Sequence, residues 1–175
     1  MVEYLLPPGP GSDVFLVEPD PTWPAEYVRQ EARVRSALGE VAVAVHHAGS
    51  TSVPGLAAKP VIDMVLVVPD ASHEEAYVRA LTDAGYAFSH REPEWYEHRM
   101  FRARTPRVNL HVFGEGCEEV DRMLAFRDHL RRHEADRATY ERTKRALAAR
   151  SWDRVQDYAD AKSDVVADIM TRALR

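Results

Sequence analysis

Two short apolar runs, separated by a turn-rich segment, constrain the fold of this chain more than any other feature. Val41–Val45 is an unbroken run of small apolar residues, and Pro60–Val68 is apolar apart from one acid, Asp63. Strands that are covered on both faces show such continuous runs, and each run is far too short to cross a membrane. The sequence therefore predicts two buried strands, near 41–48 and 59–68, that lie next to each other in one sheet.

Patterns typical of helices and further strands flank this pair. A helix is expected to begin at Trp23, beside Pro24, and to be stopped by Gly39. A capping-box pattern at Ser72–Glu75 predicts a second helix that ends at Gly85. Further strands are expected at 86–90, 95–104 and 108–113, and charged helices at 118–133, 135–149 and 152–173.

The order of these elements predicts an α/β (α+β) domain. It is expected to contain a mixed β-sheet with flanking helices and a helical C-terminal third packed beside the sheet. Residues 1–12 contain three prolines and two glycines, which indicates a flexible N-terminal arm. Residues 13–175 are expected to form a single domain that begins with an edge strand at 13–17, because this length is typical of one domain.

Composition excludes several classes of protein. The chain has 175 residues, 45% of them hydrophobic and 29% charged, which fits a folded domain rather than a disordered chain or a membrane protein. Its net charge of −5 argues against a broad surface for duplex nucleic acid, although a local basic pocket is compatible with it. The single cysteine, Cys117, excludes an internal disulfide and a cysteine-rich zinc site. Without a signal-peptide pattern, a cytoplasmic location and no membrane partner are expected.

The segment between the two predicted strands has the composition of an anion-binding turn. Gly49 lets a ligand approach the backbone closely because it has no Cβ. The next residues, Ser50, Thr51 and Ser52, offer hydroxyl groups, and exposed N–H groups in such a turn form a concavity that binds anions. Lys59 adds a positive charge that suits a phosphate.

Asp63 is the unusual residue of the strand that follows. A carboxylate on an apolar strand is costly unless it is paired or bound to a metal. The alternative interpretation is an ordinary polar loop, with Asp63 satisfied by the backbone or by an arginine. The combination of Asp63 with the Gly-Ser turn and Lys59 favours a phosphate and metal site. The segment is not a P-loop, because Gly49 and Gly55 are misplaced and no Lys-Ser/Thr pair follows.

At this segment the chain resembles the GrpB family. The run GSTSVPGLAAKPVIDM, at positions 49–64, is similar to the family's signature almost throughout, and the resemblance extends over about 13–173. Asn109-Leu110-His111-Val112 resembles a later strand of the family, and 126–131 resembles the helix that follows it. The resemblance implies a nucleotidyltransferase-like fold. The family also occurs as a domain fused to dephospho-coenzyme A kinase.

The resemblance also implies roles for individual residues. Gly49 and Ser50 would form the nucleotide-phosphate turn, and Asp63 would be the first carboxylate that binds Mg²⁺. In active members of the wider superfamily a second acid stands two residues later, where this chain has Val65. The candidate on the neighbouring strand is His111. Cationic and aromatic positions of the C-terminal helices, which would bind phosphates, are matched by Arg127, Tyr140, Lys144 and Lys162.

Other histidines and the cysteine have simpler interpretations. His46 and His47 are adjacent, so on a strand they face opposite sides and do not both enter one site. His98 fits either a metal or substrate ligand or an exposed hairpin. Cys117 is interpreted as an ordinary thiol.

Two functions follow from these observations, and a third is weaker. The first is transfer of a nucleotidyl or phosphoryl group from a nucleoside triphosphate to a small-molecule acceptor, with Asp63 on Mg²⁺ and Ser50, Lys59 and Arg127 on phosphates. The second is a non-catalytic nucleotide-binding or accessory module, for example one linked to coenzyme A metabolism, which Val65 favours. A purely structural partner-binding domain leaves Asp63 unexplained. The acceptor, the nucleotide base and the oligomeric state are not specified by the sequence.

Overall fold

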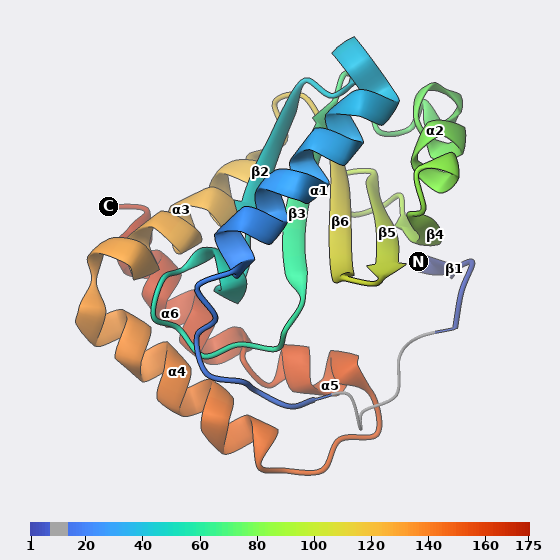
Figure 1. Ribbon diagram of the computed structural model, residues 1–175. Helices are drawn as coiled ribbons and strands as arrows, with labels where there is room; N and C mark the ends of the chain where they lie inside the picture. Colours follow the sequence, from blue (N-terminus) through green and yellow to red (C-terminus); the bar gives the residue numbers. More distant parts are fainter. Residues whose placement is uncertain (8–13) are drawn as a thin grey trace.

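The computed structural model describes residues 1–7 and 14–175, and within them six strands form one mixed sheet (Figure 1). The strands lie in the order β1-β4-β5-β6-β3-β2. β3 and β6 are parallel, and all other neighbouring strands are antiparallel. The strands are β1 (Glu3–Tyr4), β2 (Ala44–Ala48), β3 (Ile62–Val68), β4 (Ala87–Glu92), β5 (His98–Arg104) and β6 (Arg107–Gly114).

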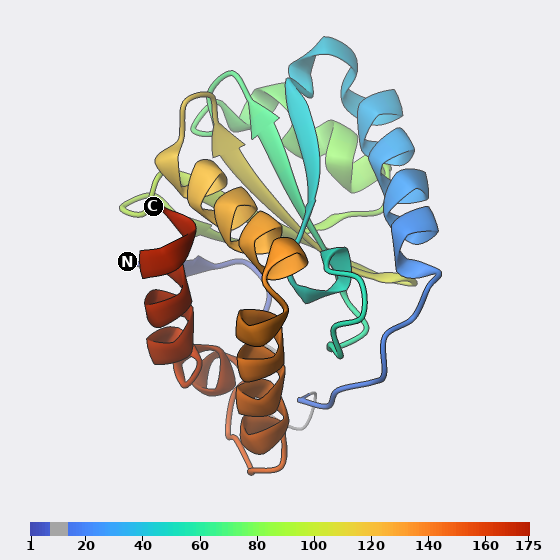
Figure 2. The ribbon, with the colours of Figure 1, turned by 90° about the vertical axis from the view of Figure 1, so that its left-hand side faces the viewer.

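Helices cover both faces of this sheet (Figure 2). Because side chains alternate along a strand, β3 serves two cores. Met64 and Leu66 pack with residues of α1 and α2 on one face, whereas Val65 and Val67 pack with Val120 of α3 on the other. The helices are α1 (Trp23–Leu38), α2 (Val78–Asp83), α3 (Glu118–Arg132), α4 (Glu134–Ala148), α5 (Val155–Asp160) and α6 (Ser163–Ala173).

The C-terminal helices pack against the turn that joins β2 to β3. Val53 and Leu56 of that turn share one apolar cluster with Leu130 of α3, Tyr140 of α4 and Ile169 of α6. This contact explains how a helical third, distant in sequence, is held beside the sheet. The predicted mixed sheet, the β2–β3 pair and the packed C-terminal helices are confirmed.

Two predicted helices are wrong in their extent. Ser72 does not cap a helix, because its backbone N–H and its hydroxyl both donate to Asp70 Oδ1, at 2.8 and 2.7 Å. Glu75, the acid of that pattern, pairs with His73 Nε2 at 2.9 Å, and Glu74–Ala76 forms a 3₁₀ segment without a side-chain cap, so the regular helix begins only at Val78. The expected continuous helix 152–173 is two helices, α5 and α6, with residues 161–162 between them.

The N-terminal residues also differ from the sequence-based expectation. Within the expected arm 1–12, Glu3–Tyr4 forms a strand that pairs with β4, and residues 8–12 lie outside the described part of the chain. Of the expected strand 13–17, residue 13 lies outside the described part as well, and Val17 makes a single bridge to Ala58. None of the described helices has both the length and the apolar character that crossing a membrane requires.

Candidate functional site

Gly49 and Asp63 meet where β2 ends and β3 begins, because Ala48 and Asp63 are partners in the antiparallel pair. Gly49 has a φ of +65°, which L side chains rarely adopt. A Cβ built on Gly49 would lie 2.3 Å from Asp63 Oδ2. Only glycine therefore lets the carboxylate lie against the backbone here, and the chain then turns through the short 3₁₀ segment Ser50–Ser52.

Asp63 is held by a neighbour across the parallel strand pair. Asn109 of β6 is its register partner, and Asn109 Nδ2 donates to Asp63 Oδ1 at 2.9 Å. Burial raises the pKa of the Asp63 carboxyl above its ordinary value, and the Asn109 hydrogen bond and nearby lysines oppose this rise. The carboxylate is thus fixed in orientation and surrounded by positive charge.

Those lysines are the only three in the sequence, against twenty arginines, and all three line one cavity of about 830 Å³ with Asp63. Lys59 precedes β3, Lys144 belongs to α4, and Lys162 lies between α5 and α6. They converge from segments that are far apart in sequence. The break between α5 and α6 places Lys162 in this lining.

Lys144 is the most buried of the three, with 2% of its surface exposed. Its Nζ donates to Ser50 Oγ at 3.0 Å and to the Ala57 carbonyl, and it lies 5.0 Å from the centre of the Tyr140 ring. Burial, with the nearby charge of Lys162, lowers the pKa of Lys144 to about 7. The pKa of Lys162 is also lowered, by burial, and its Nζ lies 4.7 Å from the centre of the Tyr158 ring.

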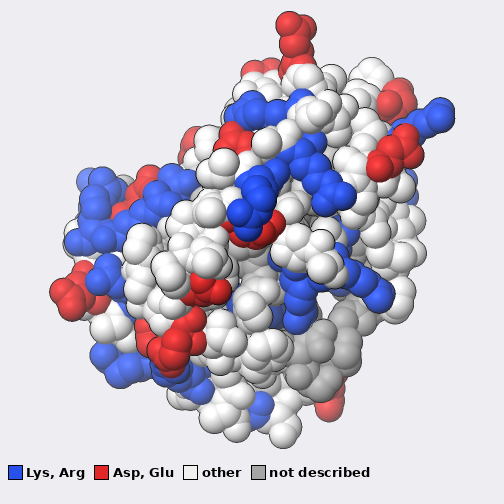
Figure 3. Space-filling model, viewed as in Figure 1, with Lys and Arg blue, Asp and Glu red and all other residues white. Residues whose placement is uncertain are grey.

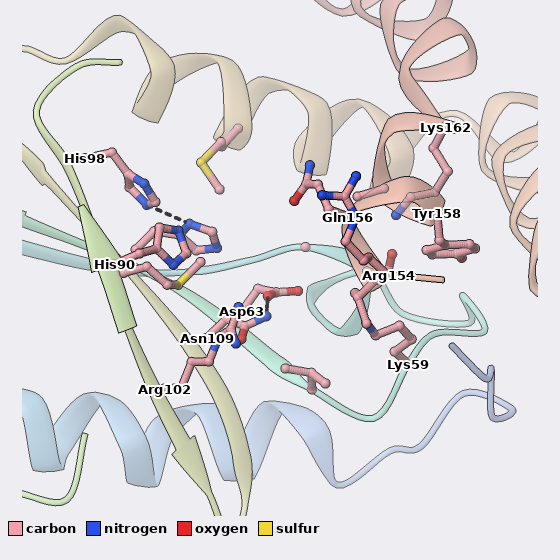
Figure 4. Close-up of a pocket in the computed structure, with 18 of the residues that line it drawn as sticks. Lys59, Asp63, His90, His98, Arg102, Asn109, Arg154, Gln156, Tyr158 and Lys162 are labelled. Carbon is pink, nitrogen blue, oxygen red and sulfur yellow. Dashed lines mark hydrogen bonds between the residues drawn. The ribbon is translucent and has the colours of Figure 1, made fainter. Parts of the chain in front are cut away.

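The cavity has two chemically different ends (Figure 4). His90 and His98 lie at one end, Asp63 and Asn109 lie in the middle, and Lys162 with Tyr158 lies at the other end. Among the described residues, five cationic side chains line the cavity, against two carboxylates, those of Asp63 and Glu92. The cations are Lys59, Arg102, Lys144, Arg154 and Lys162.

Two residues that line the cavity each contain a buried polar atom without a hydrogen-bond partner. Within the described residues, Arg102 Nε and the Tyr158 hydroxyl are the two buried side-chain polar atoms in this condition, and both residues line the cavity. Burying a polar group without a partner is costly, and such groups are rare in folded proteins.

The structure brings most of the sequence-predicted site residues together. Those that line the cavity are Gly49, Ser50, Thr51, Lys59, Asp63, His111, Lys144 and Lys162. Burial lowers the pKa of His111 to about 3, and its Nδ1 lies 3.1 Å from His98 Nε2. Thr51 contributes to the wall while its hydroxyl bonds to His47 Nε2, at 3.0 Å, and to the Val61 carbonyl.

Three predicted site residues are not in the cavity lining. Arg127 donates to the His47 carbonyl at 2.9 Å and to Asp128 at 2.7 Å, so its guanidinium joins α3 to β2. The Ser52 hydroxyl donates to the Gly49 carbonyl and closes the turn. Tyr140 is packed in the core of the C-terminal helices, with its ring edge against Phe126.

Val65, the position at which the family resemblance led us to look for a second acid, is fully buried. It packs in the apolar cluster beneath α3 with Ala48, Val67 and Phe113. Its side chain lies on the same face of β3 as Asp63, but α3 covers this part of the strand. Of the adjacent histidines, His47 is buried and stacks on Tyr27 with ring centres 4.7 Å apart.

Sequence reasoning gave no site role to the cavity residues Asn109, Arg154 and Gln156, and it ranked Arg102, on the predicted hairpin, behind the other cationic candidates. Asn109 stands two positions before His111 on an otherwise apolar strand, so the alternation of side chains was a usable signal for its face. The scarcity of lysine was another usable signal. The sequence could not predict that Arg154 and Gln156 line the cavity, because their position there depends on how α5 is oriented.

Comparisons with known proteins place the chain among relatives along almost its whole length. The family model described as "GrpB protein" matches residues 13–172. A UPF0157 protein of Halalkalibacterium halodurans is 52% identical over 162 residues, covering 93% of this chain and 83% of the relative. A dephospho-CoA kinase of Mycolicibacterium paratuberculosis is 30% identical over 186 residues, covering 91% of this chain but 46% of the kinase. The crystal structure of the conserved protein GrpB from Enterococcus faecalis superposes with a TM-score of 0.78 at 28% identity, covering 91% of this chain and 97% of that one.

Proposed function

This chain belongs to the GrpB family, and from the geometry of its cavity we propose that it binds a nucleoside triphosphate and transfers a nucleotidyl or phosphoryl group to a small molecule. The observation that carries this proposal is the convergence of all three lysines on one cavity that contains Asp63. Although the chain has a net charge of −5, the positive charges of its three lysines are concentrated in this cavity. Such a site attracts a compact polyanion, and a triphosphate has the required charge.

The residues around Asp63 fit one Mg²⁺ ion rather than two. Mg²⁺ takes about six oxygen ligands, and proteins commonly supply one or two carboxylates while substrate phosphates and water supply the rest. Asp63 and a bound triphosphate meet that requirement together. A two-metal site needs further carboxylates, and Val65 is buried where the second acid would stand. Within the described residues, no group of three or more His, Cys, Asp or Glu with ligand-distance spacing includes Asp63.

In this proposal the chain's own residues position the phosphates. Ser50 Oγ and the ammonium groups of Lys144 and Lys162 hold the chain of phosphates against the Gly49 turn. When bound, Mg²⁺ would supply Lewis-acid stabilisation of the charge that develops on the transferred group. The proposal includes the nucleotidyltransferase-like fold that the family resemblance implies.

A second candidate function is a non-catalytic nucleotide-binding or accessory module. The burial of Val65 favours it, because a cavity with a single central carboxylate resembles a transfer site that has lost its metal ligands. A relative named dephospho-CoA kinase, of which this chain matches about half, supports a link to coenzyme A metabolism. The two functions share the ligand and differ in their dependence on Asp63 and Mg²⁺.

Calorimetric titration of nucleoside triphosphates separates these functions. The wild type and Asp63→Asn are each titrated with Mg²⁺ and with chelator, and the products formed from a pool of metabolites are identified by mass spectrometry. Transfer predicts tighter binding with Mg²⁺ in the wild type and loss of turnover in Asp63→Asn. Binding that is independent of both Mg²⁺ and Asp63 contradicts transfer and supports the module. No binding under any condition contradicts both.

A matched pair of charge-removing variants tests the position of the site. Lys162→Met removes an ammonium from the cavity but keeps the aliphatic stem. Arg142→Met removes an exposed cation from α4, the helix that also bears Lys144, at a point outside the cavity lining. We expect Lys162→Met to weaken triphosphate binding at least tenfold, whereas Arg142→Met leaves it unchanged. Equal effects of the two variants would contradict the assignment of the cavity.

A further inference from the structure

Three side chains at the histidine end of the cavity are spaced as ligands of one metal ion. Within the described residues, His90, Glu92 and His98 form the group of His, Cys, Asp or Glu whose ligand atoms all lie within 4.8 Å of one another. His98 Nδ1 lies 2.7 Å from Glu92 Oε2, and His90 Nε2 lies 3.7 Å from the same oxygen. His90 and His98 are buried, and Glu92 is partly buried. The group is therefore a converging cluster rather than a chance meeting of surface side chains.

The strand geometry explains why these residues converge. His90 and Glu92 stand two apart on β4, so their side chains leave the same face of the sheet. His98 is the register partner of Glu92 on β5. A group built on two paired strands has a fixed backbone, which suits a ligand set that must keep its geometry.

The nitrogen of each histidine that does not face Glu92 has a partner of its own. His98 Nε2 lies 3.1 Å from His111 Nδ1, and His90 Nδ1 lies 3.2 Å from Ser89 Oγ. Metal-binding histidines almost always use the second nitrogen in this way, because the bond fixes the ring and its tautomer. Binding a metal through His98 Nδ1 requires the ring proton on Nε2, from which it donates to His111.

We propose that His90, Glu92 and His98 bind a divalent first-row transition-metal ion, with zinc as the reference case, through His90 Nε2, Glu92 Oε2 and His98 Nδ1. Two imidazole nitrogens with one carboxylate favour ions of this class over Mg²⁺, which prefers oxygen ligands only. Three protein ligands leave a coordination position open, as in sites where zinc acts on a substrate. All three side chains line the same cavity as Asp63, so the open position is available to a ligand bound there. This site does not depend on the proposed nucleotide function.

Metal titration without nucleotide tests the proposal. The protein is stripped with a chelator and titrated with Zn²⁺ against a chromophoric competitor, and with Co²⁺ while its visible absorption is recorded. We expect one ion per chain and a Co²⁺ spectrum typical of nitrogen and oxygen ligands. We expect Glu92→Gln and His98→Gln each to weaken Zn²⁺ binding more than 100-fold, and His111→Asn, which alters an outer partner, by roughly 10- to 100-fold.

His73 and Glu75 provide the matched control, because they form an exposed histidine–glutamate pair with Nε2 and Oε1 2.9 Å apart. His73→Gln leaves Zn²⁺ binding unchanged if the proposal holds. Asp63→Asn should also leave it unchanged, so failure of the nucleotide proposal and failure of this one give different results. Circular dichroism checks that each variant folds. If a variant does not fold, the Co²⁺ spectrum of the wild type still tests the proposal. Two results would overturn the proposal. One is that the wild type binds Zn²⁺ no more tightly than a Glu92→Gln, His98→Gln double variant. The other is a Co²⁺ spectrum that is unchanged from that of the free ion.

Discussion

At the scale of single residues, Gly49 and Asp63 depend on each other. The carboxylate occupies the space that any side chain at position 49 would need. The same contact holds Asp63 beside the turn that offers Ser50. A strand acid and a turn glycine, separated by fourteen positions in sequence, therefore form one structural unit at the centre of the cavity.

Gly49→Ala is expected to destabilise the protein more than Gly55→Ala. Both glycines have a positive φ, of +65° and +75°, so alanine at either position carries a backbone cost of roughly 1–2 kcal/mol. A Cβ at position 55 meets nothing within 4 Å, whereas one at position 49 overlaps the Asp63 carboxylate. Urea denaturation measures both free energies of unfolding. Equal losses in the two variants would show that the close contact with Asp63 has no energetic consequence.

Lys144 gives the protein a distinctive dependence of stability on pH. Its folded-state pKa of about 7 lies below the ordinary 10.5, so between these values the unfolded chain binds more protons than the folded one. Stability relative to Lys144→Met should therefore rise as pH increases from about 7 towards 10, because the cost of burying an ammonium disappears. Below pH 7 the lysine is protonated in both states and that cost is fully present. Denaturation of both proteins at several pH values tests this, and a difference in stability that does not change with pH contradicts it.

At the scale of secondary structure, the spacing of apolar residues and the positions of glycine and proline predicted most elements. The α1 stripe ended at Gly39 and the apolar run of β3 ended at Val68, where the sequence indicated. The failures lie where the side-chain contacts differ from those that the sequence pattern predicts. Ser72 binds Asp70 and Glu75 pairs with His73, so neither residue caps a helix. The break before α6 has no sequence signal as strong as glycine or proline.

Packing of α6 is expected to control both stability and the cavity. Ile169 is fully buried among residues of the β2–β3 turn, α3 and α4. Ile169→Ala should lower the free energy of unfolding by about 2–5 kcal/mol. It should also weaken triphosphate binding, because Lys162 lies at the start of the same helix. Val28→Ala on α1, where the side chain is 59% exposed, is the control and should change neither quantity. If a folded Ile169→Ala protein binds the triphosphate as the wild type does, the packing of α6 does not control the cavity, and this prediction is contradicted.

At the scale of the whole molecule, charge is distributed unevenly. Figure 3 shows Lys and Arg interspersed with Asp and Glu over the face in view. The cavity departs from this mixture: its described lining has five cations against two carboxylates, in a chain of net charge −5. The residues of the 49–63 segment were predictable because one short stretch contains them. Lys144 of α4 and Lys162 just before α6, together with Arg102 and Arg154, reach the cavity only through tertiary packing. A family resemblance was needed to identify the two lysines.

This distribution predicts selectivity for small anions over nucleic acid. Triphosphate affinity should fall as salt is raised from about 0.01 to about 0.5 M, because the Debye length shortens from about 30 Å to a few ångströms. A fluorescent DNA duplex should not bind at physiological salt, because a net charge of −5 argues against a broad basic surface. Titrations followed by fluorescence anisotropy measure both, and duplex binding of similar affinity would contradict the assignment.

Nuclear magnetic resonance of selectively labelled lysine tests the central claim most directly. Because the chain has three lysines and all of them line the cavity, ¹³C-lysine labelling reports on the cavity alone without any substitution. We predict that a nucleoside triphosphate shifts the Cε–Hε signals of Lys59, Lys144 and Lys162 together, with one common dissociation constant, and that the uncharged nucleoside does not. Signals that remain unchanged at saturating triphosphate, or that move equally with the nucleoside, would contradict a phosphate site in this cavity.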